Sequence, residues 1–259
     1  MAWVRISYLG NMVDRSSQLL VAVVSDIHGN LTAFEAVLAD LRRTSPDLVL
    51  HGGDLADGGS SPVAIVDRIR DLGWQGVMGN TDEMLVRPSS LEDFANQSSG
   101  PPALWSAIRR VALATISELG EERLAWMRGL PRVTTMPGFT LVHASPGNCW
   151  HAPAAEATNG ELEAIYGSLG TPIVAFGHTH RPAIRKMTGP LKQVINTGSV
   201  GLPYDGDPRA CYLLLDGTIP SIRRVEYSME KELKALSSCG LPGAEWTARM
   251  LRTSSPLMP

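Results

Sequence analysis

Short apolar runs alternate with helical patterns over the first third of the chain. Leu19–Ser25 is a short apolar run rich in β-branched residues, which predicts a buried strand. Apolar side chains then recur at helical spacing from Leu31 to Leu41. A second strand, a second helix and a third strand are expected at Leu48–Leu50, from Pro62 and at Gly76–Met78. This alternation predicts an α/β fold, in which ligands bind at the carboxyl ends of the strands.

The pattern changes in residues 88–131, which we interpret as an inserted helical cap. Residues 89–102 are polar and end in Pro-Pro, so we expect a loop there, followed by one or two helices over Ala103–Arg128. The later chain predicts a hairpin, a helix, a buried strand and several short strands: Arg132–Met136 with Thr140–His143, Thr158–Leu169, Pro172–Phe176 and the region 183–227. The tail is expected to hold one short helix, Glu230–Leu236, and then Pro- and Ser-rich chain.

The composition is that of an ordinary globular protein, and the net charge argues against two classes of partner, nucleic acids and membranes. The 259 residues are 44% hydrophobic and 19% charged, and the net charge of −3 argues against a dedicated nucleic-acid or membrane surface. No apolar run reaches the ~18 residues that a membrane helix needs. Residues 1–18 lack the pattern of a secretion signal. Three widely spaced cysteines favour a reducing compartment, so we expect a cytoplasmic protein.

Side chains able to bind metal follow the predicted strands at five places along the chain. These places hold Asp26 and His28, then Asp54, then Asn80, then His143, and finally His178 and His180. Side chains two residues apart in an extended segment point to the same side, so the two members of each closely spaced pair can reach the same site. Carboxylates, imidazoles and an amide without a thiolate suit Mn, Fe, Zn, Ni or Co. They exceed the coordination of one ion, so two divalent metal ions are expected.

The order of these motifs, D-x-H, G-D, G-N-x-D, H and G-H-x-H, resembles that of the metallophosphoesterase (calcineurin-like phosphoesterase) superfamily. It is most similar to the small bacterial phosphodiesterase branch, and the resemblance covers about residues 19–227. It implies a β-sandwich of two mixed sheets flanked by helices. The catalytic domain would span 19–227, between an N-terminal extension, 1–18, and a C-terminal helix and tail, 228–259.

The resemblance also implies a role for each motif. The ligands of the first metal would be Asp26, His28 and His180, those of the second Asn80, His143 and His178, and Asp54 would bridge the two. A water between the metals, acidified towards hydroxide, would attack phosphorus, and the two cations would stabilise the phosphoryl oxygens.

Two positions depart from the family pattern. Many members carry a histidine, thought to protonate the leaving group, where this chain has Thr81. A threonine hydroxyl can bond a phosphate oxygen but cannot act as an acid near pH 7. Protein phosphatases and diadenosine tetraphosphatases carry an arginine where this chain has Gly58, so one phosphate clamp is missing.

Three further residues near the motifs have two interpretations each. His151, in the loop after His143, could replace the missing acid or be an exposed loop histidine. Asp82 could orient a neighbouring ligand or cap the helix that follows. Trp150 could form a wall of the substrate pocket or serve only in packing.

These observations predict a dinuclear metal-dependent hydrolase of phosphodiesters or other small phosphoesters, with manganese the favoured metal for activity. One alternative is a phosphatase that resembles the Ser/Thr protein phosphatases or acts on nucleotide monoesters. The other is a catalytically silent scaffold that keeps its metals.

Overall fold

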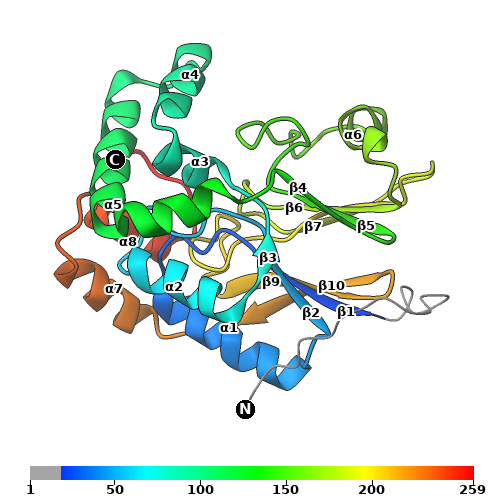
Figure 1. The fold of residues 1–259 in the computed structure, drawn as a ribbon, viewed down its shortest axis with the longest axis horizontal. Helices are drawn as coiled ribbons and strands as arrows, with labels where there is room; N and C mark the ends of the chain where they lie inside the picture. The colour runs from blue at the N-terminus through cyan, green and yellow to red at the C-terminus, as the bar shows by residue number, and fades with distance from the viewer. Residues whose placement is uncertain (1–18) are drawn as a thin grey trace.

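Two five-stranded sheets lie face to face at the centre of the molecule (Figure 1). The computed structural model describes residues 19–259, so the expected N-terminal extension, 1–18, lies outside the described residues. The first sheet has the order β10-β9-β1-β2-β3 and consists of β1 (Leu20–Val24), β2 (Leu48–His51), β3 (Gln75–Gly76), β9 (Ala210–Asp216) and β10 (Ile219–Val225). The second has the order β4-β5-β6-β8-β7 and consists of β4 (Val133–Met136), β5 (Phe139–Val142), β6 (Ile173–Phe176), β7 (Ala183–Lys186) and β8 (Gln193–Asn196).

Both sheets are mixed, which confirms the predicted fold class. In the first sheet β1 pairs with β2 in parallel and with β9 in antiparallel orientation, and β2 pairs with β3 in parallel. In the second sheet β5, β6 and β8 run parallel, while β4 and β7 are antiparallel edge strands. Parallel strands place their carboxyl ends at the same edge of a sheet, so the loops that carry the polar motifs are brought together.

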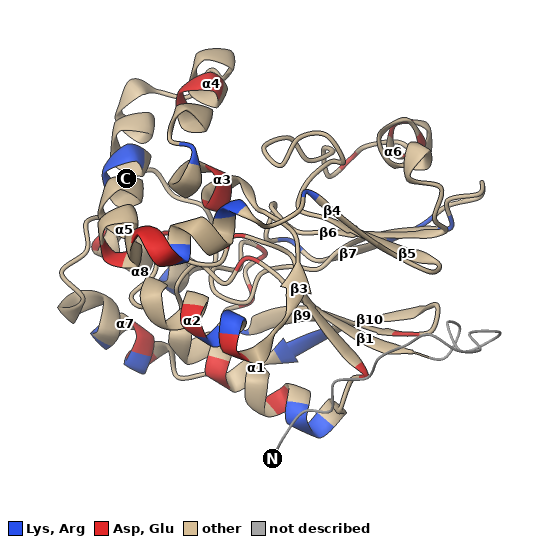
Figure 2. Cartoon of the chain, in the orientation of Figure 1, with Lys and Arg blue, Asp and Glu red and all other residues tan. Residues whose placement is uncertain are grey.

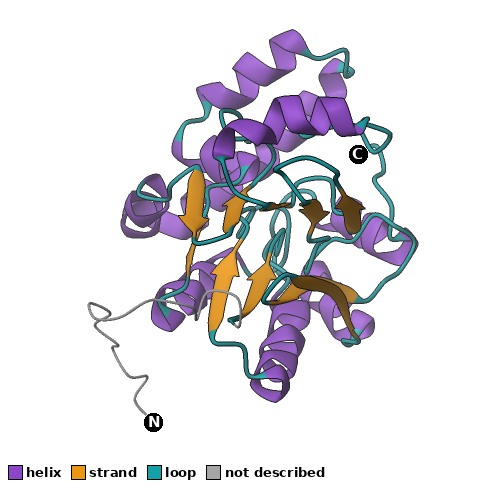
Figure 3. Cartoon of the chain, turned by 90° about the vertical axis from the view of Figure 1, so that its right-hand side faces the viewer, coloured by secondary structure: helices purple, strands orange, loops and turns teal. Residues whose placement is uncertain are grey.

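Alternating side chains of the strands build the layers of the core. Val21 and Val23 on β1 face the second sheet and pack with residues such as Ile195. Ala22 and Val24 point the other way, because side chains alternate along a strand, and pack with α1 (Leu31–Thr44) and α2 (Pro62–Leu72). The outer face of the second sheet is covered by α6 (Asn159–Tyr166) and the short 3₁₀ helix η1 (Gly167–Leu169). Figure 3 shows the helices outside the two sheets.

Three helices stand over one end of the sandwich, where a helical cap was expected (Figure 1). They are α3 (Asn80–Val86), α4 (Ser89–Gln97) and α5 (Pro102–Arg128), and α5 changes direction at Gly120. The prediction of a loop over 89–102 was wrong for its first nine residues, which form α4. The polar composition is overridden by tertiary packing, because Leu91 is buried in the core of the cap and Phe94 packs edge-on against Trp105.

The C-terminal segment holds two helices, α7 (Met229–Ser238) and α8 (Ala244–Thr253). The short helix expected over Glu230–Leu236 is therefore confirmed, whereas the irregular chain expected after it was wrong. Met250 and Leu251 of α8 pack against Leu202 and Leu236, and this burial stabilises a helix that the surrounding Pro and Ser residues obscured.

Charged side chains of both signs are interspersed on the outer helices (Figure 2). Helices α1, α2 and α5 each carry acidic and basic residues, several of them paired, as in the bond from Arg123 to Asp67. Within residues 19–259 no helix combines the length and the apolarity needed to cross a membrane.

Candidate metal centre

The seven candidate ligands follow five different strands, six of them on loops and Asn80 at the first residue of α3. They are Asp26 and His28 after β1, Asp54 after β2, Asn80 after β3, His143 after β5, and His178 and His180 after β6. Five of them have positive φ angles: Asp26 (54°), His28 (48°), Asp54 (54°), His178 (64°) and His180 (57°). Residues other than glycine rarely adopt this region, and such strain persists only where the surroundings fix the loop.

Two glycines allow the loops after β2 and β3 to lie against each other. A side chain at Gly79 would collide with the carboxylate of Asp54, and one at Gly53, where φ is +87°, would collide with the backbone of Gly79. These contacts explain why glycine precedes Asp54 in one motif and Asn80 in the other.

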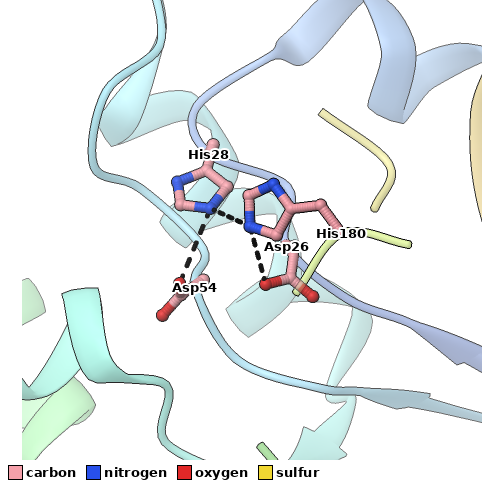
Figure 4. Close-up of side chains that lie close together, drawn as sticks. All are labelled: Asp26, His28, Asp54 and His180. Carbon is pink, nitrogen blue, oxygen red and sulfur yellow. Dashed lines mark hydrogen bonds and ion pairs between the residues drawn. The ribbon is translucent and has the colours of Figure 1, made fainter. Parts of the chain in front are cut away.

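One group of ligands gathers around His28 (Figure 4). Single ligand atoms of Asp26, His28, Asp54 and His180 all lie within 4.8 Å of one another, and all four residues are buried. Nε2 of His28 is 3.2 Å from Nε2 of His180 and 3.5 Å from Oδ2 of Asp54. Nε2 of His180 is also 3.2 Å from Oδ1 of Asp26. This spacing gives one cation access to both imidazoles and both carboxylates.

A second group gathers around Asn80. Its amide oxygen Oδ1 is 3.0 Å from Nε2 of His143 and 2.8 Å from Nδ1 of His178. Nε2 of His143 is in turn 3.5 Å from Oδ1 of Asp54. The two carboxylate oxygens of Asp54 therefore face different groups, Oδ2 towards His28 and Oδ1 towards His143.

The tautomers of three histidines provide a test of whether cations fit these groups. Nδ1 bonds a backbone carbonyl oxygen in each: in His28 that of Asp57 (2.8 Å), in His143 that of Gly52 (2.7 Å) and in His180 that of Leu202 (2.6 Å). A carbonyl oxygen can only accept, so Nδ1 carries the proton and Nε2 of the neutral ring presents a lone pair. The lone pairs of His28 and His180 then meet head to head at 3.2 Å, an arrangement that a cation between them would stabilise.

Burial and neighbouring groups shift the pKa values of three candidate ligands. Burial lowers the pKa of His178 to about 4, so its imidazole is neutral at pH 7. Burial would raise the pKa of Asp26, but its interactions with His180 outweigh this and lower the pKa, so the carboxylate is ionised at pH 7. Burial would lower the pKa of His143, but the negative charges of Asp54 and Asp26 outweigh this and raise it, so the surroundings of this ring favour positive charge.

Asp82 and Thr81 both support the loop of Asp54. Asp82 is fully buried, and its carboxylate accepts from the backbone N–H groups of Asp54 (2.8 Å), Leu55 (2.9 Å) and Gly79 (2.9 Å). It therefore caps α3 at Gly79 and bonds the backbone of the Asp54 loop, while a role of Asp82 in catalysis stays a prediction. The N–H of Thr81 donates to Oδ1 of Asp54 at 2.9 Å, while its buried hydroxyl has no partner within the described part of the chain.

His151 contacts a residue of α4 and none of the candidate metal ligands in the described interactions. Its exposed ring packs edge-on against Phe94 of α4, with ring centroids 5.3 Å apart. Trp150 packs on the same Phe94 at 4.9 Å. The structure therefore brings these two loop residues to the cap, and the proton-donor role of His151 stays a prediction.

Sequence reasoning missed two residues that support the ligands from behind. The ring of Tyr204 stacks on His180, with centroids 4.4 Å apart and planes 19° from parallel. Asp57 accepts a bond from Thr115 of α5 at 2.8 Å, while its carbonyl holds His28. Asp57 stands three residues after Asp54 and could have been suspected, but no sequence signal connects Tyr204 to this site.

The chain belongs to the calcineurin-like phosphoesterase superfamily, a family of phosphoester hydrolases. The sequence profile of the calcineurin-like phosphoesterase superfamily domain matches residues 19–218. The predicted family, fold class and hydrolase class are thereby confirmed, and the buried Asp and His cluster is able to hold metal ions.

Individual relatives cover the chain to different extents. An uncharacterised protein of Methanocaldococcus jannaschii is 30% identical over 253 residues, which cover 90% of this chain and 97% of that protein. The crystal structure of a metallophosphoesterase from Sphaerobacter thermophilus has a TM-score of 0.75 at 26% identity and covers 92% of this chain and 99% of that chain. A symmetrical bis(5'-nucleosyl)-tetraphosphatase of Methylococcus capsulatus is 28% identical over 152 residues, only 57% of this chain and 50% of that protein.

Proposed function

We propose that this protein is a dinuclear metal-dependent phosphodiesterase. The observation that carries the proposal is the position of Asp54, whose Oδ2 lies 3.5 Å from Nε2 of His28 and whose Oδ1 lies 3.5 Å from Nε2 of His143. A carboxylate placed between two sets of N and O ligands is the arrangement that a bridged pair of divalent ions requires. Manganese is the metal that we propose for activity.

The residues would divide between the ions as the motifs imply. One ion would take Asp26, His28 and His180, the other Asn80, His143 and His178, and Asp54 would contact both. When bound, the two cations supply a nucleophilic hydroxide at neutral pH and positive charge for the phosphoryl oxygens. The protein fixes this geometry, because backbone carbonyls orient three imidazoles and Asp82 holds the loop of Asp54.

The choice of diesters over monoesters rests on Gly58, and Thr81 bears on the leaving group. A monoester dianion needs more positive charge than a diester monoanion, and the arginine clamp is replaced by Gly58. The unpartnered hydroxyl of Thr81 can donate to a phosphoryl oxygen, a role suited to either ester. Since Thr81 cannot protonate a leaving group near pH 7, we expect the fastest turnover for substrates with good leaving groups.

A nucleotide phosphatase is the second candidate, supported by the similarity to the bis(5'-nucleosyl)-tetraphosphatase over half of that relative. It would need a basic clamp from outside the Gly58 loop. Several cap arginines are already paired in the structure, including Arg109 with Glu92 and Arg123 with Asp67. These pairs favour the diesterase.

A substrate panel tests the proposal on the full chain loaded with Mn²⁺. We expect higher kcat/KM for bis-p-nitrophenyl phosphate than for p-nitrophenyl phosphate or a phosphopeptide. Faster turnover of either monoester would contradict the diesterase assignment. Absence of turnover with two ions bound, in each of the Mn, Fe, Ni and Zn forms, would instead indicate a metal-binding scaffold.

A further inference from the structure

A pocket of about 170 Å³ opens between α3 and α4 on one side and the loop 145–151 on the other. We call it the side pocket, and the residues lining it include Ser90, Phe94, Gln97, Asn148, Trp150 and His151. Both of its walls belong to segments that begin at candidate ligands, since α3 starts at Asn80 and the loop follows His143. Glu83 of the lining stands three residues after Asn80, about 4.5 Å along the helix axis, so the pocket lies beside the segment that carries this candidate ligand.

A buried carboxylate fixes the walls of the side pocket. Glu83, one helical turn after Asn80, accepts hydrogen bonds from Arg87 (2.8 Å), Arg132 (2.5 Å), Cys149 (3.1 Å) and Trp150 (2.8 Å). Burial would raise the pKa of Glu83, but the bonds from Arg87 and Arg132 outweigh it and lower the pKa to about 2. The indole of Trp150 is thus held in place before any ligand arrives, which reduces the entropy lost on binding.

The charges around the side pocket compensate one another. Arg87 pairs with Glu83 and with Asp93 (3.0 Å), and Arg132 also pairs with Glu83. Two guanidinium groups therefore face two carboxylates, and the pocket offers no excess of positive charge to a second phosphate. An uncharged group fits this environment better than an anion.

Three aromatic rings line the side pocket, those of Phe94, Trp150 and His151. Phe94 lies 4.9 Å from Trp150 with planes 30° apart, and 5.3 Å from His151 with planes 68° apart. The rings pack on one another, so a planar group can stack only on a ring face that lines the pocket, whatever the group's substituents.

Polar groups at the same pocket can bond the edge of such a ring. Ser90 is only 2% exposed, and its hydroxyl has no partner among the described residues, a cost that a bound ligand would relieve. Oδ1 of Asn148 accepts from the N–H of Trp150 at 2.8 Å, which leaves the amide NH₂ as a donor. Gln97 contributes a second amide to the lining.

We propose that the side pocket binds the base of a nucleoside phosphodiester while the phosphate lies at the metal centre. The planar, uncharged base matches the aromatic cluster, and its ring edge matches the amides and the free hydroxyl. This inference rests on the proposed phosphodiesterase function and names its substrate class.

Two esters with the same leaving group provide the kinetic test. The Mn²⁺-loaded full chain is assayed with thymidine 5'-p-nitrophenyl phosphate and with methyl p-nitrophenyl phosphate. We expect kcat/KM for the thymidine ester to be at least about tenfold higher, and Phe94→Leu to reduce this ratio about tenfold through KM. Phe94→Tyr, which keeps the ring, should retain the ratio, as should Trp74→Leu, which removes a ring outside the pocket. A wild-type ratio near one, or an unchanged ratio in Phe94→Leu, would overturn the proposal.

Direct binding separates the pocket from the chemistry. If the protein hydrolyses neither ester, this result contradicts the phosphodiesterase function but not the side pocket. Calorimetric titration with thymidine then tests whether the side pocket binds a base. We expect submillimolar binding to the wild type, weakened about tenfold by Phe94→Leu and about threefold by Ser90→Ala. No binding of thymidine to the wild type, or equal binding to all three proteins, would refute the side-pocket assignment.

Discussion

The candidate metal centre and the side pocket begin on the same segments but are built differently. At the metal centre, main-chain geometry does the positioning: five ligands have positive φ, and three imidazoles bond backbone carbonyls. At the side pocket, side chains from α3, α4 and the loop 145–151 meet around Glu83. The comparison indicates that the backbone positions the candidate metal ligands, whereas contacts between side chains form the side pocket.

Asp54→Asn should give the largest effect, because a carboxamide offers only one oxygen to two cations. We expect kcat/KM for bis-p-nitrophenyl phosphate to fall by about three orders of magnitude or more. Asp216→Asn, which makes the same change at an exposed strand end, is the matched control and should retain wild-type activity. Near-wild-type turnover by Asp54→Asn would contradict the proposal that Asp54 bridges the two metal ions.

His51 tests the scaffold beneath the candidate metal centre, three residues before Asp54. Its ring is fully buried, and neither nitrogen has a partner within residues 19–259. Burial lowers its pKa from 6.5 to about 4. Between these values the unfolded chain binds the proton more tightly, so stability falls as the pH falls through this window and levels off below pH 4. The loss amounts to about 3 kcal/mol.

The His51→Leu variant isolates this contribution from the other histidines. We expect its free energy of unfolding to exceed that of the wild type by a margin that grows from pH 7 to pH 4, measured by urea denaturation. A margin that stays constant over this range would show that His51 does not titrate as its burial requires.

The stacking of Tyr204 on His180 tests whether support from a distant segment tunes the metal centre. Tyr204→Leu frees the ring of His180, so we expect Mn²⁺ affinity to weaken about tenfold or more. Tyr204→Phe keeps the stacked ring and should bind Mn²⁺ almost as the wild type does. Equal affinities of the two variants would mean that stacking contributes nothing.

His151 gives the smallest expected effect and decides whether the side pocket takes part in the chemistry. If its imidazole donates a proton, His151→Ala should slow esters with poor leaving groups by about tenfold and p-nitrophenyl esters much less. The measurement is the dependence of kcat/KM on leaving-group pKa over a series of aryl esters. A uniform loss across the series would assign His151 to binding alone.

The sequence predicted the regions where local pattern decides the structure. The apolar runs before Asp26 and His178 predicted buried strands. Because these two polar residues follow the ends of the strands, the sequence also predicted that they share a site. Helices α4 and α8 were missed because Leu91 and Met250 become buried only through partners distant along the chain. The stacking of Tyr204 on His180 and the hydrogen bonds to Glu83 were missed for the same reason, because tertiary structure and not sequence spacing determines the partners of these residues.

Metal content tests the central claim, a pair of ions bridged by Asp54, most directly. The full chain is stripped, reloaded with Mn²⁺, freed of excess metal and measured by inductively coupled plasma mass spectrometry. We predict two ions per wild-type chain and fewer than two in Asp54→Asn, with Asp216→Asn unchanged. One ion per fully active wild-type chain, or two ions in Asp54→Asn, would contradict the account.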